Sequence, residues 1–278
     1  MFAGLLLAAT IDASTFSYDA ALPLRAVYAT AVQRNGATVQ GIRFASSGGR
    51  TVHGVVVRGA GSGKHPAVLF VHWLGDEATT NHTEFEDDAA RLAQRGVTSL
   101  LIDAMWSEKD WFEKGRSPQT DYERSIDQVI DLRRSLDALL AQPNVDASRV
   151  AYVGHDFGSM YGAVLSGVDP RPQWYVLMAG TTSFSEWYLL GRKPSDVQSY
   201  VAQMQPLNPG NFLSRSNARG FLFQFSSRDR YVTPEHELEF FQFAPLPRTM
   251  AIYDIDHSLA TPAAEEDRLA WLGEKLRV

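Results

Sequence analysis

Hydrophobic positions along the chain follow two alternating patterns, and together they predict an α/β architecture. Short apolar runs rich in Val, Leu, Ile and Phe are typical of strands that are buried on both faces. Between these runs, apolar residues recur at every third or fourth position, as they do along one face of a helix. Strands and helices that alternate in this way form a mostly parallel sheet with helices on both faces.

The buried strands are expected at 67–72, 97–102, 149–153, 174–179, 220–225 and 249–254. The expected helices run from Phe85 to Gly96 as its C′ residue, from a capping box at 120–123 to Pro143, and over 157–166, 234–243 and 263–276. Two earlier strands, 38–44 and 51–58, flank a hairpin-type turn and predict an antiparallel edge. The loop 59–66 precedes the first buried strand, and an irregular insert spans 181–217.

Composition narrows the class of protein. The chain has 278 residues with 45% hydrophobic and 21% charged residues, which fits one α/β domain over 1–278 with a sizeable core. The net charge of −6 argues against nucleic acids and anionic membranes as partners, so we expect a small-molecule substrate. The oligomeric state stays open. The chain has no cysteine, and its histidines lack the partner spacing of a metal site, so we expect no metal and no cofactor.

The N-terminal run from Met1 to Ala9 is apolar but is not preceded by a basic segment, because the first basic residue is Arg25. The run is also too short to span a bilayer. We therefore expect a segment packed on the domain and a cytoplasmic rather than a secreted protein.

The segment 153–158, Val-Gly-His-Asp-Phe-Gly, stands where a strand ends and a helix begins. Glycines two positions before and two positions after Asp156 let the chain turn sharply, which exposes the central side chain at the N-terminus of the helix. Such a position offers backbone N–H groups and the positive end of the helix dipole to negative charge. The pattern predicts a nucleophile elbow with Asp156 as the nucleophile.

Two further residues complete a triad in the chain order nucleophile, acid, histidine. Asp229 follows the strand 220–225, and His257 follows the strand 249–254. Open α/β sheets build their sites at the carboxyl ends of the strands, so these side chains are expected beside Asp156. We predict that His257 is a general base oriented by Asp229.

From about Thr38 to its end, the chain resembles α/β-hydrolases of the dienelactone hydrolase type, on the stretches 71–75, 150–159, 223–229 and 253–258. That family carries cysteine or serine where this chain has Asp156. The string Gly-His-Asp-aromatic-Gly instead resembles epoxide hydrolases and haloalkane dehalogenases. The resemblance implies the α/β-hydrolase fold with a reduced cap, because the short insert 181–217 stands where those relatives carry a large helical cap.

An aspartate nucleophile changes the expected substrate. Attack of a carboxylate on an ester carbonyl would give an anhydride, whereas attack on an sp³ carbon gives an alkyl ester that water activated by His257 can cleave. The sequence therefore predicts an epoxide hydrolase that forms a diol. The alternatives are a haloalkane or haloacid dehalogenase, an esterase or lactonase of the dienelactone hydrolase type if Asp156 replaces a serine, and a non-catalytic binding homologue.

The remaining site residues follow from the same chemistry. We expect oxyanion donors on the N–H of Phe157 and in the loop Trp73-Leu74. The resemblance to epoxide hydrolases implies a tyrosine proton donor in the insert, where Tyr188 is the first candidate and Tyr200 the second. His72 is expected to hold the oxyanion loop or to contact substrate, Trp106 to form a pocket wall, and His155 to point away from the site.

Overall fold

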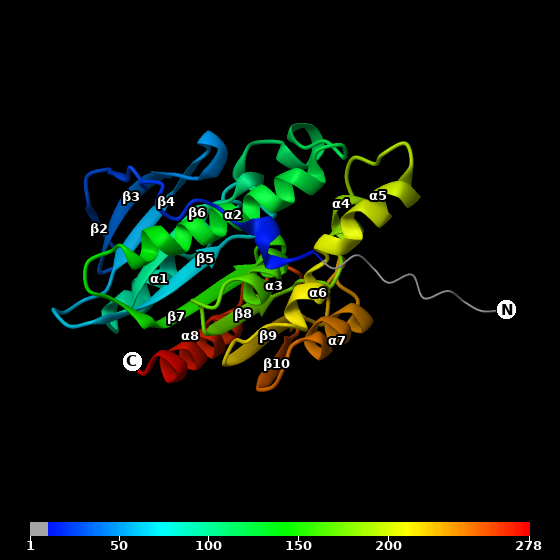
Figure 1. The fold of residues 1–278 in the computed structure, drawn as a ribbon. Helices are drawn as coiled ribbons and strands as arrows, with labels where there is room; N and C mark the ends of the chain where they lie inside the picture. The colour runs from blue at the N-terminus through cyan, green and yellow to red at the C-terminus, as the bar shows by residue number, and fades with distance from the viewer. Residues whose placement is uncertain (1–10) are drawn as a thin grey trace.

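The computed structural model describes residues 11–278, so the predicted packing of Met1–Ala9 lies outside the described residues. In this part of the chain, ten strands form one sheet in the order β1-β3-β4-β6-β5-β7-β8-β9-β10, and β2 pairs with β3 (Figure 1). The mutually parallel strands are β5 (His65–Val71), β6 (Thr98–Asp103), β7 (Val145–His155), β8 (Trp174–Met178), β9 (Gly220–Ser226) and β10 (Arg248–Tyr253). The antiparallel strands are β1 (Val27–Tyr28), β2 (Val32–Arg34), β3 (Ala37–Ala45) and β4 (Thr51–Arg58).

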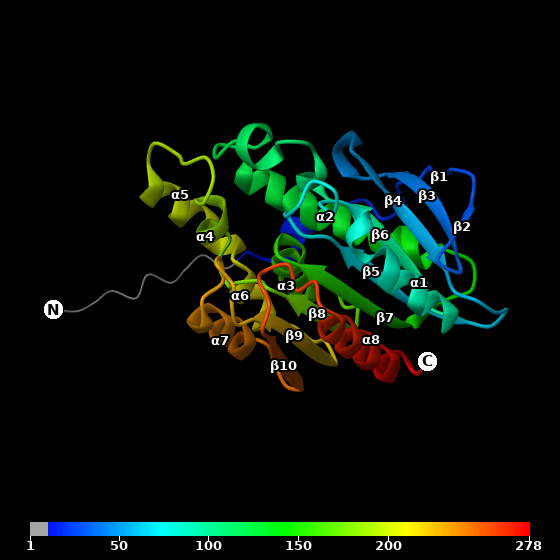
Figure 2. The same ribbon diagram turned by 180° about the vertical axis from the view of Figure 1, so that it is seen from behind.

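Helices cover both faces of the sheet (Figures 1 and 2). One face carries α1 (Glu86–Gln94) and α8 (Pro262–Leu276), and the other carries α2 (Asp121–Leu140), α3 (Phe157–Val168), α6 (Pro209–Leu213) and α7 (Pro234–Phe243). Neighbouring residues of a strand point to opposite faces of the sheet. Val68 and Phe70 of β5 therefore pack under α1 and α8, while Leu69 and Val71 pack in the core on the opposite face. This two-sided burial explains the continuous apolar runs of the sequence.

The carboxyl ends of β5, β7, β9 and β10 meet at one edge of the sheet, and the insert lies at this edge. The insert contains α4 (Phe184–Tyr188), α5 (Val197–Met204), a 3₁₀ turn (Gln205–Leu207) and α6. Short 3₁₀ or π turns elsewhere are Ala13–Phe16, Ser47–Gly49, His82–Phe85, Met105–Ser107 and Trp111–Gly115. Among residues 11–278, no helix is both long and apolar enough to cross a bilayer.

The structure corrects three details of the prediction. The insert 181–217 is not irregular, because three short helices form in it. The capping box at Thr120 does not form: α2 begins at Asp121, and the Thr120 hydroxyl donates to the carbonyl of Ser117 instead of capping the helix. The loop expected over 59–66 ends earlier, because β5 already begins at His65. The antiparallel edge is present, and Gly96 has the positive φ of +85° expected of a C′ residue.

Candidate active site

The elbow holds Asp156 between β7 and α3 in a conformation that few residues adopt. Asp156 has φ 56° and ψ −118°, and its N–H donates to the carbonyl of Met178 over 2.9 Å. Both flanking glycines are required by close backbone contacts. A Cβ at Gly154 would stand 2.3 Å from the carbonyl oxygen of Gly158, and a Cβ at Gly158 would stand 2.2 Å from that of Val71. The predicted elbow is therefore present, and its sharp turn depends on residues without side chains.

The carboxylate of Asp156 is buried and bound on one side. Its Oδ2 accepts the N–H of Leu74 over 2.8 Å, whereas Oδ1 has no hydrogen-bond partner among residues 11–278. Burial raises the pKa of Asp156 to about 7, although the electrostatic interaction with His257 and the N–H groups of Leu74 and Phe157 oppose this shift. One oxygen is thus hydrogen-bonded to the loop after β5, and the other has no partner among residues 11–278.

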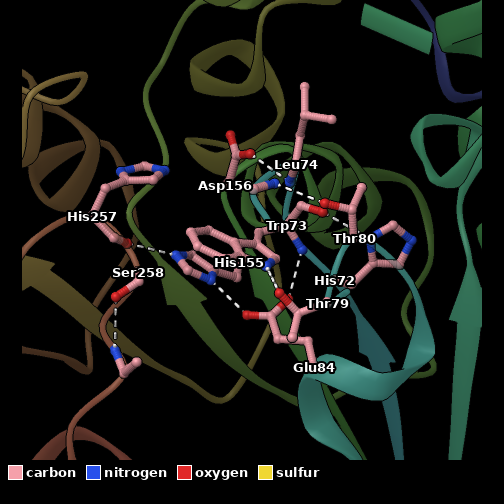
Figure 3. A network of polar contacts seen from close by, with 12 residues as sticks. His72, Trp73, Leu74, Thr79, Thr80, Glu84, His155, Asp156, His257 and Ser258 are labelled. Carbon is pink, nitrogen blue, oxygen red and sulfur yellow. Dashed lines mark hydrogen bonds and ion pairs between the residues drawn. The ribbon is translucent and has the colours of Figure 1, made fainter. Parts of the chain in front are cut away.

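His257 and Asp229 come together as the strand order predicts. Nδ1 of His257 lies 2.7 Å from Oδ2 of Asp229, and the second oxygen of Asp229 accepts the N–H groups of Tyr231 and Val232 over 2.8 and 3.0 Å. Burial favours a raised pKa for Asp229, but its hydrogen bonds to His257 and to the backbone outweigh burial and lower the pKa. Nε2 of His257 is buried and has no partner within the described residues. In Figure 3, the His257 ring and the Asp156 carboxylate lie on the same side of the stacked rings of Trp73 and His155.

Of the two N–H groups that the loop Trp73-Leu74 offers after β5, one is directed at Asp156. The N–H of Leu74 points at Asp156, but the N–H of Trp73 donates to Glu84 over 2.7 Å and is not available to the site. His72 holds this loop from below, since its Nδ1 lies 2.8 Å from the carbonyl of Trp73 and its Nε2 accepts the N–H of Ala104. Burial lowers the pKa of His72, in keeping with a neutral ring.

The indole groups around the site are engaged within the protein. Nε1 of the buried Trp106 donates to the carbonyls of His72 and Trp73 and so supports the loop that carries Leu74. The ring centroids of Trp106 and Phe157 are 5.6 Å apart. Nε1 of Trp73 donates to Thr79. Nε1 of Trp187 donates to Thr181.

Neither predicted proton donor has its hydroxyl turned to Asp156. The hydroxyl of Tyr188 is buried and lies 2.7 Å from that of Tyr161 and 3.2 Å from Ser125. The hydroxyl of Tyr200 donates to Asp121 over 2.8 Å. Both residues therefore fix the insert and α3 to α2.

Two aromatic residues that the sequence did not single out lie against His257, the predicted general base. Trp187 from α4 and Tyr231 from the loop after β9 have ring centroids 5.4 and 5.1 Å from that of His257. Tyr231 is 55% exposed and lines an open cleft of about 570 Å³ together with Leu74 and His257. Asp156 is completely buried and does not line this cleft, although the lining residue Leu74 donates its N–H to the Asp156 carboxylate.

Among residues 11–278, no three His, Asp or Glu side chains gather in a way that could hold a metal ion.

Comparison with known proteins places this geometry in context. Residues 13–177, more than half of the chain, match the model of a family described as esterase FrsA-like. A search of curated proteins gave no significant match.

Several solved structures share the fold. An acetyl xylan esterase from Paenibacillus sp. R4 superposes with a TM-score of 0.73 at 18% identity, over 91% of this chain and 89% of that one. Acetyl xylan esterase 1 from Thermoanaerobacterium sp. JW/SL YS485 gives 0.70 at 14% identity, over 92% and 89%. A putative dienelactone hydrolase from Klebsiella pneumoniae subsp. pneumoniae MGH 78578 gives 0.62 at 17% identity, over 86% and 98%. The chain therefore has the α/β-hydrolase fold.

Proposed function

The chain belongs to the FrsA-like esterase family, and we propose that it is a hydrolase with Asp156 as its nucleophile, which opens epoxides to diols through an alkyl ester on that residue. The observation that carries the proposal is the position of the Asp156 carboxylate. Its Oδ2 accepts the N–H of Leu74, the proposed oxyanion donor, and its Oδ1 has no partner among the described residues. An ester substrate bound as in a serine hydrolase would need that same donor for its carbonyl oxygen.

In the first step, Oδ1 of Asp156 attacks a ring carbon of the epoxide, the ring C–O bond breaks, and the alkoxide takes a proton from an acid. In the second step, His257 removes a proton from water, and the hydroxide attacks Cγ of Asp156. The resulting oxyanion is stabilised by the N–H of Leu74. The intermediate then expels the diol as an alkoxide, which takes the proton back from His257 and leaves Asp156 as a carboxylic acid. Transfer of that proton through solvent to the conjugate base of the first-step acid restores both the carboxylate and the acid.

The acid of the first step is best assigned to Tyr231. Its phenol lines the cleft beside His257, whereas the hydroxyl of Tyr188 is hydrogen-bonded in the core. A dehalogenase is less well supported, because the indole N–H groups of Trp73, Trp106 and Trp187 already donate to protein oxygens. A halide would need such donors to be free.

A second candidate is an esterase, which family membership favours. With Asp156 bound at the oxyanion donor, His257 would have to activate water for direct attack on the ester. The two functions differ in where the oxygen of water enters first. In the alkyl-ester route, the oxygen of water enters Asp156, and the product receives an oxygen of Asp156. In direct hydrolysis it enters the product acid.

The test combines a trapping variant with labelled water. In His257→Gln, styrene oxide is expected to add its full mass to the peptide that contains Asp156, because ring opening expels no atom, whereas 1-bromobutane would add its mass less hydrogen bromide. Asp156→Asn in the same background is the control and should give no adduct. A single turnover of wild type in H₂¹⁸O should place ¹⁸O in Asp156.

Hydrolysis of 4-nitrophenyl acetate with ¹⁸O in the first acetate released, and without any alkyl adduct, would replace the proposal by the esterase. An adduct from 1-bromobutane alone would replace it by the dehalogenase. The absence of both adducts and of ester hydrolysis would leave a binding homologue.

A further inference from the structure

Glu84 and the buried His155 form a partly buried contact beneath the two loops that carry the proposed catalytic groups (Figure 3). Glu84 lies in the 3₁₀ turn His82–Phe85, far from both loops in sequence. Its Oε2 accepts the N–H of Trp73 over 2.7 Å, and its Oε1 lies 2.6 Å from Nδ1 of His155. The carboxylate therefore joins the oxyanion loop to the residue before the nucleophile.

The second nitrogen of His155 reaches the other loop. Its Nε2 lies 3.0 Å from the carbonyl oxygen of His257, and its ring is stacked on Trp73 with 5.1 Å between centroids and 7° between planes. A carbonyl oxygen can accept but not donate a hydrogen bond, so Nε2 of His155 must carry the proton. His155 thus binds the backbone of the general base with one nitrogen and Glu84 with the other.

We propose that Glu84 and His155 are a pair of positioning residues that hold the Leu74 donor and the His257 base at a fixed separation around Asp156. The N–H fixed by Glu84 belongs to Trp73, whose carbonyl forms the peptide bond that bears the N–H of Leu74. The carbonyl fixed by His155 belongs to His257 itself. The pair does not touch the reacting atoms, and its catalytic effect rests on the proposed role of Asp156 as the nucleophile.

The protons of the pair suggest a matched control. Oε1 of Glu84 and Nδ1 of His155 lie within hydrogen-bond distance, and one hydrogen atom on either of them completes this bond. Glutamine at position 84 can make these bonds with a neutral ring, because its amide oxygen accepts from Trp73 and its NH₂ group donates to Nδ1. Alanine can make neither bond.

The main experiment compares Glu84→Ala with Glu84→Gln. Loss of the outer-shell groups that orient metal ligands typically costs about 10–100-fold in activity, and a comparable loss is expected for groups that orient a base and a backbone donor. We expect kcat for styrene oxide to fall by about this factor in Glu84→Ala with little change in KM, and to stay within about threefold of wild type in Glu84→Gln. Equal activity in the two variants, whether both are high or both are low, would overturn the proposal.

A second variant separates the two halves of the pair and remains informative if Glu84→Ala does not fold. In His155→Phe, the ring still fills the space against Trp73, and Glu84 still binds the Trp73 N–H, but the bond to His257 is lost. Rapid-mixing measurements should then show slow hydrolysis of the alkyl ester and near-normal ester formation, since His257 acts in the second step. Slow formation with normal hydrolysis would overturn the assignment.

Amide hydrogen exchange tests the pair without any substrate. The Trp73 and Leu74 amides should exchange faster in Glu84→Ala and stay protected in Glu84→Gln and His155→Phe. If wild type forms no adduct with any probe, the proposed function fails while this measurement still decides the role of the pair. Unchanged protection in a folded Glu84→Ala would overturn the pair alone.

Discussion

The buried surroundings of Asp156 disfavour the charged form of its carboxylate. Its pKa is raised from 3.8 to about 7 by burial, so the folded protein binds a proton at this residue more tightly than the unfolded chain does. The stability contributed by this protonation is complete below the unfolded pKa and is lost as pH rises through about 7. In the proposed role as nucleophile, Asp156 must be ionised to attack, so activity and stability are expected to respond to pH in opposite directions.

The first prediction follows from this upward shift of the Asp156 pKa. Asp156→Asn should be more stable than wild type at pH 8, because the amide is neutral in both the folded and the unfolded state. A shift of about three units corresponds to at most roughly 4 kcal/mol, at about 1.4 kcal/mol per unit. Urea unfolding at pH 8 and pH 5 checks this, and the advantage of the variant should shrink at pH 5. A variant less stable than wild type at pH 8 would contradict it.

The second prediction distinguishes the two tyrosines. Tyr231→Phe should slow alkyl-ester formation from styrene oxide by about 10²–10⁴-fold, the usual range for general acid catalysis, with little effect on unfolding. Tyr188→Phe should keep the rate but lower stability by about 1 kcal/mol, because it removes buried hydrogen bonds to Tyr161 and Ser125. Stopped-flow measurement of alkyl-ester formation in the His257→Gln background isolates the first step. The reverse outcome would return the acid to Tyr188.

The sequence alone could predict those site residues that directly follow the carboxyl end of a strand. The contact between Asp229 and His257 was predicted in this way, because parallel strands bring their carboxyl ends to one edge. The position of Glu84 could not be predicted, since its partners Trp73 and His155 lie on other segments. The hydroxyl of Tyr188 was expected near Asp156 from its place in the insert, but the core of α2 and α3 supplies its partners.

At the scale of elements, the strand-turn-helix at the elbow depends on the absence of two side chains. The third prediction is that Gly154→Ala and Gly158→Ala each destabilise the fold by about 1–3 kcal/mol or more, because the new Cβ meets backbone atoms that cannot move aside. Gly63→Ala is the matched control, since a Cβ there meets nothing within 4 Å. Thermal unfolding of the three variants checks this. A tolerated Gly158→Ala would show that the oxyanion loop can yield.

Elements were predictable where burial dictates their pattern. The six parallel strands lie close to their predicted ranges because both faces of each are covered, which leaves apolar runs in the sequence. The strands β1 and β2 were missed because their residues are exposed and they pair only with β3. The helices of the insert are short and follow prolines and glycines, so their composition resembled that of a loop.

At the scale of the whole molecule, the insert places Trp187 against His257 and is hydrogen-bonded to a buried ion pair at the start of α2. Arg116 and Asp121 are 2.6 Å apart, and both side chains are almost completely buried. Tyr200 of α5 donates to the same carboxylate over 2.8 Å, and Arg116 also donates to the backbone carbonyl of Arg192. The insert is thus bound to the body of the protein through the Arg116–Asp121 pair. Removal of either charge would leave the other buried without a counter-ion.

The fourth prediction uses this asymmetry. Asp121→Asn leaves the Arg116 charge buried without a counter-ion, which typically costs about 3–5 kcal/mol, whereas Tyr200→Phe removes one hydrogen bond to a charged group, worth about 1.5–3 kcal/mol. Asp121→Asn should therefore be the less stable variant, with faster amide exchange over α4 and α5. The triad should persist in both, because Asp229 and His257 stand on loops after β9 and β10, and the imidazole signal of His257 in an NMR spectrum would report this. Faster exchange confined to α2 would instead mean that the ion pair stabilises that helix and leaves the insert held by Trp187 and its aromatic neighbours.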